Sequence, residues 1–333
     1  MKTYVIGDVH LRYEEPFFSV TQDFLDKLVC NAEPGATLIF TGDFFHRARP
    51  YAEELRAART FFEVCKLRKL KVVIVAGNHE YFRDRGTWAE DVFKTFDLDF
   101  IEHPTVDIIN DSLFLFLPWT PVYLLKKEGC DSMRDYYAKV LADLDWWNLK
   151  GFKRLFVVYH FEDETVFTGA ESIGVDLSVI GKFFENDIVR FGGHIHNPDS
   201  NYIGSPYATR SDETGFARRF AVVEKDGSFE YQPLPIRTEF KTLMYSELET
   251  TQYDPAVKYI IKVLDAPSFE AVKAHVDARE NVWLDDYDLK FSETRSIADR
   301  KDDERRSIRD FLALYIKQNK VDANTANYLL SVF

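Results

Sequence analysis

The chain has 333 residues, with 42 Lys and Arg against 55 Asp and Glu and a formal net charge of −13. Its 46% of hydrophobic and 29% of charged residues, with only 15 Gly and 12 Pro, are typical of a globular protein and exclude a collagen-like or disordered chain. The length predicts one large domain with an appendage, or two domains. The acidic balance argues against a general polyanion binder, but not against a DNA enzyme that uses bound metals and a local basic patch.

Targeting and cysteine signals are weak. No apolar run approaches the roughly 18–20 residues that a membrane span needs, and the acidic Asp8 comes too early for a signal peptide. Cys30, Cys65 and Cys130 are far apart and form no CxxC pair, which argues against a disulfide scaffold or a structural zinc site. We therefore expect a cytoplasmic protein with no membrane segment.

Strand and helix signals alternate through the first two-thirds of the chain. Apolar, β-rich runs predict strands at 4–6, 37–41, 72–76, 113–117, 155–159 and 187–191. Helical periodicity predicts helices at 20–30, 52–67 and 131–144. Because the strand runs are apolar on both faces and are spaced by helices, they predict an α/β fold whose sheet is covered on both sides.

The pattern changes after residue 220. Two β-rich runs flank Asp226-Gly227, a favourable hairpin turn, and Pro233 and Pro235 then predict a domain boundary. Beyond the boundary we expect a strand at 259–264, a helix at 268–278, a strand at 288–291, and short helices at 307–318 and 324–333.

Five of the apolar runs end in potential metal ligands. In chain order these are Asp8, His10, Asp43, Asn78, His79, His160, His194 and His196. Functional groups of α/β sheets gather beyond the carboxyl ends of the strands, so these residues can converge although they are far apart in sequence. Glycines precede most of them, and glycine lets the backbone turn sharply and approach an ion or a phosphate.

The type of these ligands narrows the choice of metal. The set contains no thiolate, which disfavours a structural zinc cage, and its several imidazoles disfavour a purely Mg²⁺ or Ca²⁺ site, so Mn²⁺, Fe²⁺ and catalytic Zn²⁺ remain. The set is too large for one ion with an open position, but it suits two ions that share a carboxylate. Such a pair of ions favours in-line displacement at phosphorus.

The same motifs carry a resemblance. Gly7-Asp8-Val9-His10, Gly42-Asp43, Gly77-Asn78-His79-Glu80, His160 and Gly193-His194-Ile195-His196 resemble the motifs of the calcineurin-like metallophosphoesterases. Residues 42–50 resemble the signature of the SbcD-type nuclease, the nuclease subunit of a recombination and double-strand-break repair complex. Residues 117–119 and 204–206 and Asp212-Glu213 also look like that family, and the compact size resembles its phage members. Glu80 is a departure, because the SbcD group usually has Asp there.

The resemblance implies a role for each matching residue. Asp8, His10 and His196 would hold one divalent ion, Asn78, His160 and His194 would hold a second, and Asp43 would bridge them. His79 would not bind metal but would stabilise or protonate the leaving oxygen, and His46 would help to hold DNA for exonuclease action. The expected cofactor is a pair of Mn²⁺ ions, with Mg²⁺ as the alternative.

The resemblance also implies a fold, a function and partners. The fold would be a two-sheet sandwich flanked by helices (1–235), with a small α+β capping domain (236–298) and C-terminal helices (299–333). The function would be that of a metal-dependent DNA exonuclease and endonuclease. Its expected partners are DNA, the coiled coil of an SbcC-type ABC ATPase, and a second copy of the chain, in the host cytoplasm if the protein is phage-encoded. Two alternatives remain: another calcineurin-like phosphoesterase, such as a protein phosphatase or cyclic-nucleotide phosphodiesterase, and terminal helices that fold back on their own core.

Overall fold

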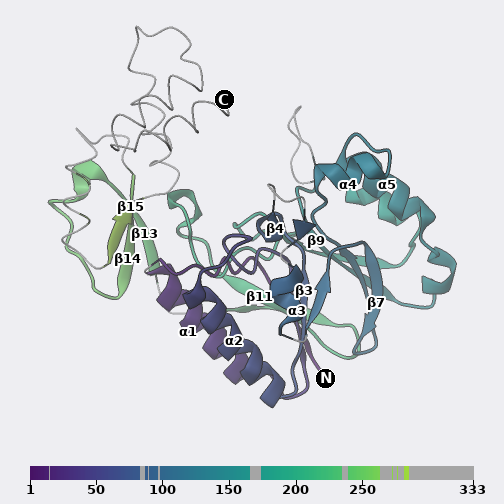
Figure 1. Ribbon diagram of the computed structural model, residues 1–333, viewed down its shortest axis with the longest axis horizontal. Coiled ribbons are helices and arrows are strands. Elements are labelled where there is room, and N and C mark those ends of the chain that lie inside the picture. The colour runs from purple at the N-terminus through teal and green to yellow at the C-terminus, as the bar shows by residue number, and fades with distance from the viewer. Residues whose placement is uncertain are drawn as a thin grey trace, which may run out of the picture.

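A computed structural model describes the chain at residues 1–14, 16–82, 87–88, 90–96, 98–165, 174–234, 239–262, 272, 276 and 281–284. Two β-sheets pack face to face, and helices lie on the outer face of each (Figure 1). The α/β sandwich expected from the sequence is therefore confirmed.

The larger sheet has six strands. In spatial order they are β12 (Phe229–Pro233), β11 (Arg219–Val223), β1 (Thr3–Ile6), β2 (Thr37–Phe40), β3 (Lys71–Val75) and β6 (Asp99–Ile101). Strands β1, β2, β3 and β6 are parallel to one another, and β11 and β12 form an antiparallel hairpin beside β1. Gly227 in its turn has a φ of +79°, which confirms the hairpin predicted there.

The smaller sheet of the sandwich has four strands. In spatial order they are β10 (Asp187–Gly193), β9 (Arg154–His160), β8 (Ser112–Leu117) and β7 (Thr105–Ile109). The strands β8, β9 and β10 are parallel, and β7 pairs with β8 in the antiparallel sense. The short strands β6 and β7 were not predicted, because neither run has the length or the apolar content of its neighbours.

Alternation along the strands builds three layers of core. Successive side chains point to opposite faces of a sheet, so Val5 and Ile39 pack against Phe114 and Phe156 between the two sheets. The other face of the six-stranded sheet packs against α1 (Phe17–Asn31) and α2 (Ala52–Leu67). The outer face of the four-stranded sheet packs against α4 (Val122–Lys127) and α5 (Met133–Asp143) (Figure 1). Each large buried side chain stabilises the fold by roughly 1.5–3 kcal/mol.

Several short helices and strands lie between the longer elements of the chain. They are η1 (Asn78–Glu80), β4 (Tyr81–Phe82), β5 (Thr87–Trp88), α3 (Glu90–Lys94), η2 (Trp146–Leu149), η3 (Leu177–Lys182), η4 (Ser211–Glu213) and η5 (Tyr245–Glu247). Among the described residues, no helix has the length and apolar character needed to cross a membrane.

A separate parallel sheet follows the sandwich. It consists of β13 (Glu239–Met244), β14 (Val257–Lys262) and β15 (Val282–Leu284), and it has its own small core around Tyr259 and Ile261. Strand β14 was predicted, but β13 and β15 were missed. The strand predicted at 288–291 lies outside the described residues. Most of the helix expected at 268–278 and all of 299–333 also lie outside them, so the division into three domains stays a prediction.

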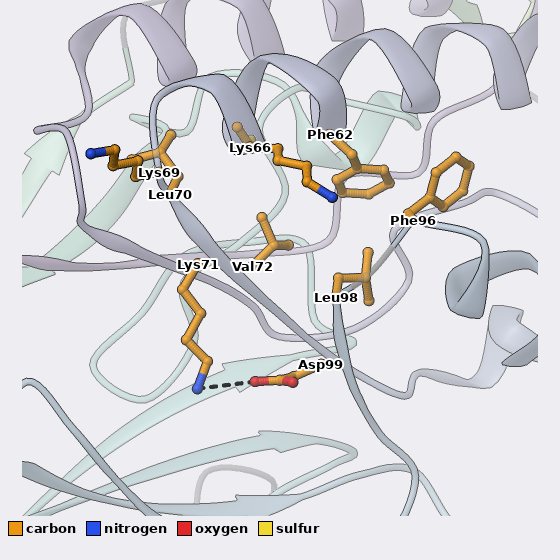
Figure 2. A pocket seen from close by; sticks show the side chains of 10 residues that line it. Phe62, Lys66, Lys69, Leu70, Lys71, Val72, Phe96, Leu98 and Asp99 are labelled. Atoms are coloured by element: carbon orange, nitrogen blue, oxygen red, sulfur yellow. Dashed lines mark ion pairs between the residues drawn. The ribbon is translucent and has the colours of Figure 1, made fainter.

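One hollow of about 340 Å³ opens at the start of β3. Figure 2 shows its apolar floor, with Phe62 and Val72, and the ion pair between Lys71 and Asp99 at its rim, 3.0 Å apart. Lys71 begins β3, whereas the predicted metal ligands Asn78 and His79 follow its other end. The hollow therefore lies at the edge of the sheet opposite to the ligands.

Candidate metal centre

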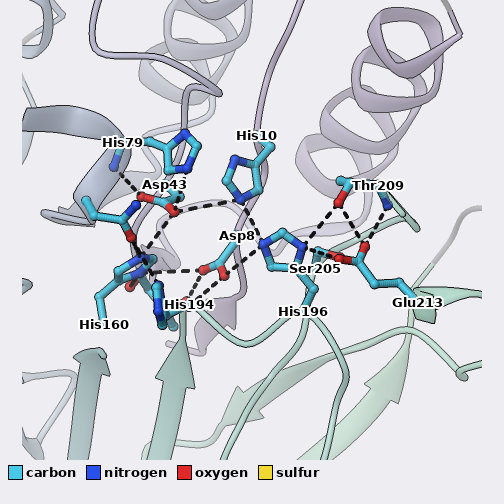
Figure 3. Close-up of polar contacts among 12 residues, drawn as sticks. Asp8, His10, Asp43, His79, His160, His194, His196, Ser205, Thr209 and Glu213 are labelled. Carbon is cyan, nitrogen blue, oxygen red and sulfur yellow. Dashed lines mark hydrogen bonds and ion pairs between the residues drawn. The ribbon is translucent and has the colours of Figure 1, made fainter. Parts of the chain in front are cut away.

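The predicted ligands follow strands that end at one edge of the sandwich. Ile6, at the end of β1, pairs with Phe40 of β2, and Phe40 pairs with Ile74 of β3, so the segments after these three parallel strands emerge together. In the other sheet, His160 at the end of β9 pairs with Gly193 at the end of β10. Because the sheets pack face to face, the two edges bring their polar side chains into one centre (Figure 3).

The backbone at this edge is bent into an uncommon conformation. His10, Asp43 and His194 have φ values of +46°, +48° and +78°. Non-glycine residues rarely adopt this left-handed region, at a cost of roughly 1–2 kcal/mol each, and such strain gathers at functional sites. The His10 N–H donates to the Asp43 carbonyl at 2.8 Å, which ties two of these turns together.

Glycine is required at two positions in these turns. A Cβ atom on Gly42, whose φ is +127°, would lie 2.1 Å from His160 Nδ1, and one on Gly77 would lie 2.2 Å from Asp43 Oδ1. Neither backbone nor ring could accommodate such contacts. These glycines therefore allow the ligand side chains to approach the neighbouring strand closely.

One set of converging groups consists of Asp8, His10 and His196. The two Nε2 atoms of His10 and His196 lie 2.9 Å apart, and His196 Nε2 lies 3.8 Å from Asp8 Oδ2. One ligand atom from each of the three residues falls within 4.8 Å of the others. This spacing suits a cation held among them.

A second set consists of Asn78, His160 and His194. Asn78 Oδ1 lies 3.2 Å from His160 Nε2 and 3.0 Å from His194 Nδ1. Asp43 Oδ2 lies between the two sets, 3.2 Å from His160 Nε2 and 3.7 Å from His10 Nε2. The structure thus brings all seven predicted ligands together, with Asp43 in the shared position.

The electrostatics of the centre leave negative charge to be balanced. Asp8 and Asp43 are buried, and burial raises the pKa of Asp8. Burial would also raise the pKa of Asp43, but His160 and His79 lower it well below its usual value, so Asp43 keeps its negative charge. Burial lowers the pKa of His10 well below its usual value and that of His194 to about 4. His160 differs: burial would lower its pKa, but Asp43 and Asp8 raise it to about 9. A proton on His160 thus partly balances the carboxylates, and a divalent cation would displace it.

The donor chemistry fits divalent cations. Imidazole nitrogens, carboxylate oxygens and one amide oxygen converge, and the buried His10 Nδ1 has no hydrogen-bond partner. His160 donates through Nδ1 to the Thr41 carbonyl at 2.9 Å, so its Nε2 faces Asp43 and Asn78 and would bind a cation once its proton is displaced. Mixed nitrogen and oxygen donors of this kind bind Mn²⁺, Fe²⁺ or Zn²⁺.

His79 faces the centre from its solvent side. Its Nδ1 donates to the His46 carbonyl, and its Nε2 lies 4.0 Å from Asp43 Oδ2. Its backbone N–H also donates to Asp43 Oδ1 at 2.9 Å. The side chain is 33% exposed, whereas that of Asp43 is 3% exposed. His79 is therefore oriented by two contacts and open to a substrate.

His46 lies beside this group. Its ring centroid is 5.5 Å from that of His10 and 5.4 Å from that of His79. Burial lowers the pKa of His46 to about 3, so the imidazole is neutral at physiological pH. The structure thus places both predicted catalytic histidines at the centre, although it does not by itself assign their roles.

Sequence reasoning gave no role to Glu80, which was noted only as a departure from a family pattern. Its buried carboxylate accepts hydrogen bonds from the backbone N–H groups of Gly77 (2.9 Å), Asp43 (3.0 Å) and Phe45 (3.3 Å). Burial raises the pKa of Glu80 to about 8. Glu80 therefore ties the turn after β3 to the turn after β2, a contact between distant segments for which the sequence holds no signal.

We expect Glu80→Ala to lower the free energy of unfolding by about 2–4 kcal/mol, because it leaves three buried N–H groups without an acceptor. Denaturant unfolding of the metal-free protein measures the change. Glu63→Ala, at an exposed position of α2, is the matched control and should fall within about 0.5 kcal/mol of wild type. Equal stability of the two variants would contradict the role given to Glu80.

Comparison with known protein families identifies the class of protein to which the chain belongs. The sequence pattern of the calcineurin-like phosphoesterases matches residues 1–198, which is more than half of the chain. The chain therefore belongs to the calcineurin-like phosphoesterase family. Membership implies a hydrolase that acts on phosphoesters, and the His and Asp groups described above are those that could hold the family's divalent metals.

Solved structures give a more distant likeness. An archaeal phosphodiesterase is 12% identical over 70% of this chain and 100% of its own, with a TM-score of 0.32. A cold-active protein-tyrosine phosphatase from Shewanella is 16% identical over 69% of this chain and 80% of its own, with a TM-score of 0.30. A protein of unknown function from Aquifex aeolicus is 19% identical over 56% of this chain and 88% of its own, with a TM-score of 0.26. No curated protein matches the chain significantly, and TM-scores this low say nothing about its substrate.

Proposed function

We propose that the chain is a metal-dependent DNA nuclease, the exonuclease and endonuclease subunit of an SbcCD-type recombination and repair complex. The observation that carries the proposal is the position of His46. This residue belongs to the segment 42–50 that resembles the SbcD-type signature, and its ring lies next to His10 and His79 at the edge of the metal centre. A phosphodiester held at the centre would therefore meet this imidazole.

Each residue then has a chemical role. The cation-holding residues would be Asp8, His10, Asp43, Asn78, His160, His194 and His196. When bound, a pair of divalent cations, Mn²⁺ or alternatively Mg²⁺, would supply Lewis-acid chemistry that activates water near neutral pH and would neutralise charge on the phosphoryl oxygens. His79 directs Nε2 at the centre and supports the leaving oxygen of the cleaved strand, a role worth ~10²–10⁴-fold in rate. His46 positions the DNA backbone beside it.

An aromatic cluster next to the centre favours a nucleic acid. Tyr81, two residues after His79, has its ring centroid 5.6 Å from Trp119 and 5.8 Å from Tyr123, with the two tyrosine rings nearly parallel. The backbone N–H of Trp119 donates to the carbonyl of Ala76, which directly follows β3, at 2.9 Å. The cluster therefore lies at the same edge of the sandwich as the predicted ligands. Tyr123 is 44% exposed. Aromatic faces of this kind stack on bases and are worth ~1–3 kcal/mol per base.

The test is hydrolysis of linear DNA by the full-length protein with Mn²⁺. We expect Mn²⁺-dependent release of nucleotides from double-stranded DNA, which a chelator abolishes, and little turnover of a phosphoprotein or a cyclic nucleotide. His103→Ala, at an exposed position that contacts no predicted ligand among the described residues, should behave as wild type. Faster turnover of the phosphoprotein or the cyclic nucleotide than of DNA would overturn the proposal in favour of another phosphoesterase.

Tyr123→Ala adds a second arm to this test. If the ring stacks on a base, the variant should raise KM for DNA by about 5- to 100-fold and raise KM for bis(p-nitrophenyl) phosphate much less, because that diester carries no nucleobase. If Tyr123→Ala changed KM by the same factor for both substrates, the aromatic cluster would no longer support a nucleic acid as the substrate.

The partners belong to the same proposal. A coiled-coil ABC ATPase of the SbcC type would dock on residues 299–333, which lie outside the described residues, and a second copy of the chain would complete a dimer. Gel filtration of the protein, with and without the candidate ATPase, measures both associations.

A further inference from the structure

Glu213 is a buried carboxylate that lies behind the predicted ligands. It ends η4, and its side chain is 1% exposed. Its Oε1 atom accepts a hydrogen bond from His196 Nδ1 at 2.8 Å (Figure 3). The same atom accepts from Arg210 Nε at 2.9 Å. It thus contacts the ring nitrogen of His196 that faces away from the centre.

The other oxygen of Glu213 is held equally firmly. Oε2 accepts from the backbone N–H of Thr209 at 2.7 Å and from its hydroxyl at 2.9 Å. Because both oxygens accept hydrogen bonds and the side chain is buried, Glu213 is held in a fixed position as an acceptor.

An ionised carboxylate determines the tautomer of the imidazole that it contacts. Because a carboxylate oxygen accepts, His196 donates to Glu213 through Nδ1, which leaves the Nε2 lone pair as the one available to a cation. That lone pair is on the atom that lies 2.9 Å from His10 Nε2 and 3.8 Å from Asp8 Oδ2. A carboxylate in this position also makes the imidazole a stronger donor to a metal.

Glu213 contacts only one of the two sets of predicted ligands, through His196. Within the described part of the chain, Glu213 forms no hydrogen bond or ion pair with Asn78, His160 or His194. His160 donates instead through Nδ1 to the Thr41 carbonyl at 2.9 Å, and Asp8 Oδ1 lies 3.6 Å from the same nitrogen. Arg218 donates to the His196 carbonyl at 2.6 Å and to that of Glu213, which holds the two residues at a fixed separation. Any effect of Glu213 should therefore reach only the Asp8–His10–His196 set.

We propose that Glu213 is a positioning residue that fixes the tautomer and orientation of His196 and so raises the affinity of the Asp8–His10–His196 set for a divalent cation, without affecting the second set. The proposal rests on the assignment of cation ligands under the proposed function, and does not depend on DNA as the substrate. It also gives this chain's two cation positions unequal support, because only His196 has behind it a carboxylate that is not itself a predicted ligand.

Calorimetric titration of the metal-free protein with Mn²⁺ tests the proposal. In Glu213→Gln we expect binding at one of the two positions to weaken by about 10- to 100-fold, while the other position keeps its wild-type affinity. Asp212→Asn is the matched control, since Asp212 is the exposed neighbour of Glu213 and contacts no predicted ligand in the described residues. It should bind both ions as wild type does.

Two further measurements separate positioning from a general structural effect. Imidazole ¹⁵N shifts of the metal-free protein should show that His196 loses its preference for a proton on Nδ1 in Glu213→Gln. The ¹⁵N shifts of His160 should stay at their wild-type values. In a His196→Gln background, Glu213→Gln should cause no further loss of Mn²⁺ affinity. Should Glu213→Gln fail to fold, Glu213→Asp withdraws the carboxylate from His196 but keeps its charge, and the same selective loss is expected.

The outcomes are distinct. A wild-type protein that binds fewer than two Mn²⁺ ions would refute the cation assignment itself. Two ions bound with unchanged affinity in Glu213→Gln, or an equal loss at both positions, would overturn only the role given to Glu213.

Discussion

Replacing His79 by alanine is expected to reduce kcat on DNA by ~10²–10⁴-fold while the protein still binds two Mn²⁺ ions. The imidazole is oriented by the His46 carbonyl and directs Nε2 at the centre, yet it remains partly exposed and stands 4.0 Å from the nearest carboxylate oxygen. These features suit a group that serves the leaving oxygen rather than a cation. Metal content by mass spectrometry and single-turnover cleavage measure the two effects separately.

The leaving group provides a sharper version of the same test. The p-nitrophenolate ion leaves without the help of an acid, so His79→Ala should reduce turnover of bis(p-nitrophenyl) phosphate much less than turnover of DNA. His103→Ala serves as the control for an exposed histidine that contacts no predicted ligand among the described residues. A loss of bound metal, or equal losses on both substrates, would show that the role assigned to His79 is wrong.

Asp43→Asn is expected to weaken Mn²⁺ binding by at least about 100-fold and to abolish measurable cleavage, because a shared negative charge is removed from between the two ligand sets. The substitution keeps an oxygen that can accept the His79 N–H, so the turn after β2 should survive. Circular dichroism and calorimetric titration measure fold and binding. Asp111→Asn, at an exposed position of the β7–β8 turn, is the matched control.

The metal-free form of the same variant has a second signature. Asp43 is the largest of the influences that raise the pKa of His160 to about 9. Removing its charge should lower the pKa of His160, so that the ring loses its proton at a lower pH in the variant than in wild type. Histidine titration by NMR follows this change, and full activity with two bound ions in Asp43→Asn would refute the bridging position.

Much of the fold follows from local patterns. The buried strands β1, β2, β3, β8 and β9 were predicted because each is an apolar run bounded by turn residues. The convergence of Asp8, Asp43 and His160 could also be anticipated, because parallel strands end at a common edge. Their roles as ligands remain predictions until an ion is seen.

Other features could not be predicted from the sequence, for physical reasons. β6 is too short to show a period, and β13 alternates exposed and half-buried residues that resemble a loop as much as a strand. Glu80 and Glu213 bind backbone or ring N–H groups that come from segments distant in sequence. Such contacts depend on the folded arrangement of the chain, and a lone glutamate carries no mark of them.

The ligands come from both layers of the sandwich: β1, β2 and β3 in one sheet and β9 and β10 in the other. Cations held by Asp43 together with His160 would therefore cross-link the two sheets, in addition to any part in chemistry. The two sheets could then slide against each other only after the cations were released. Metal loading and rigidity of the whole sandwich are thus two aspects of the same set of contacts.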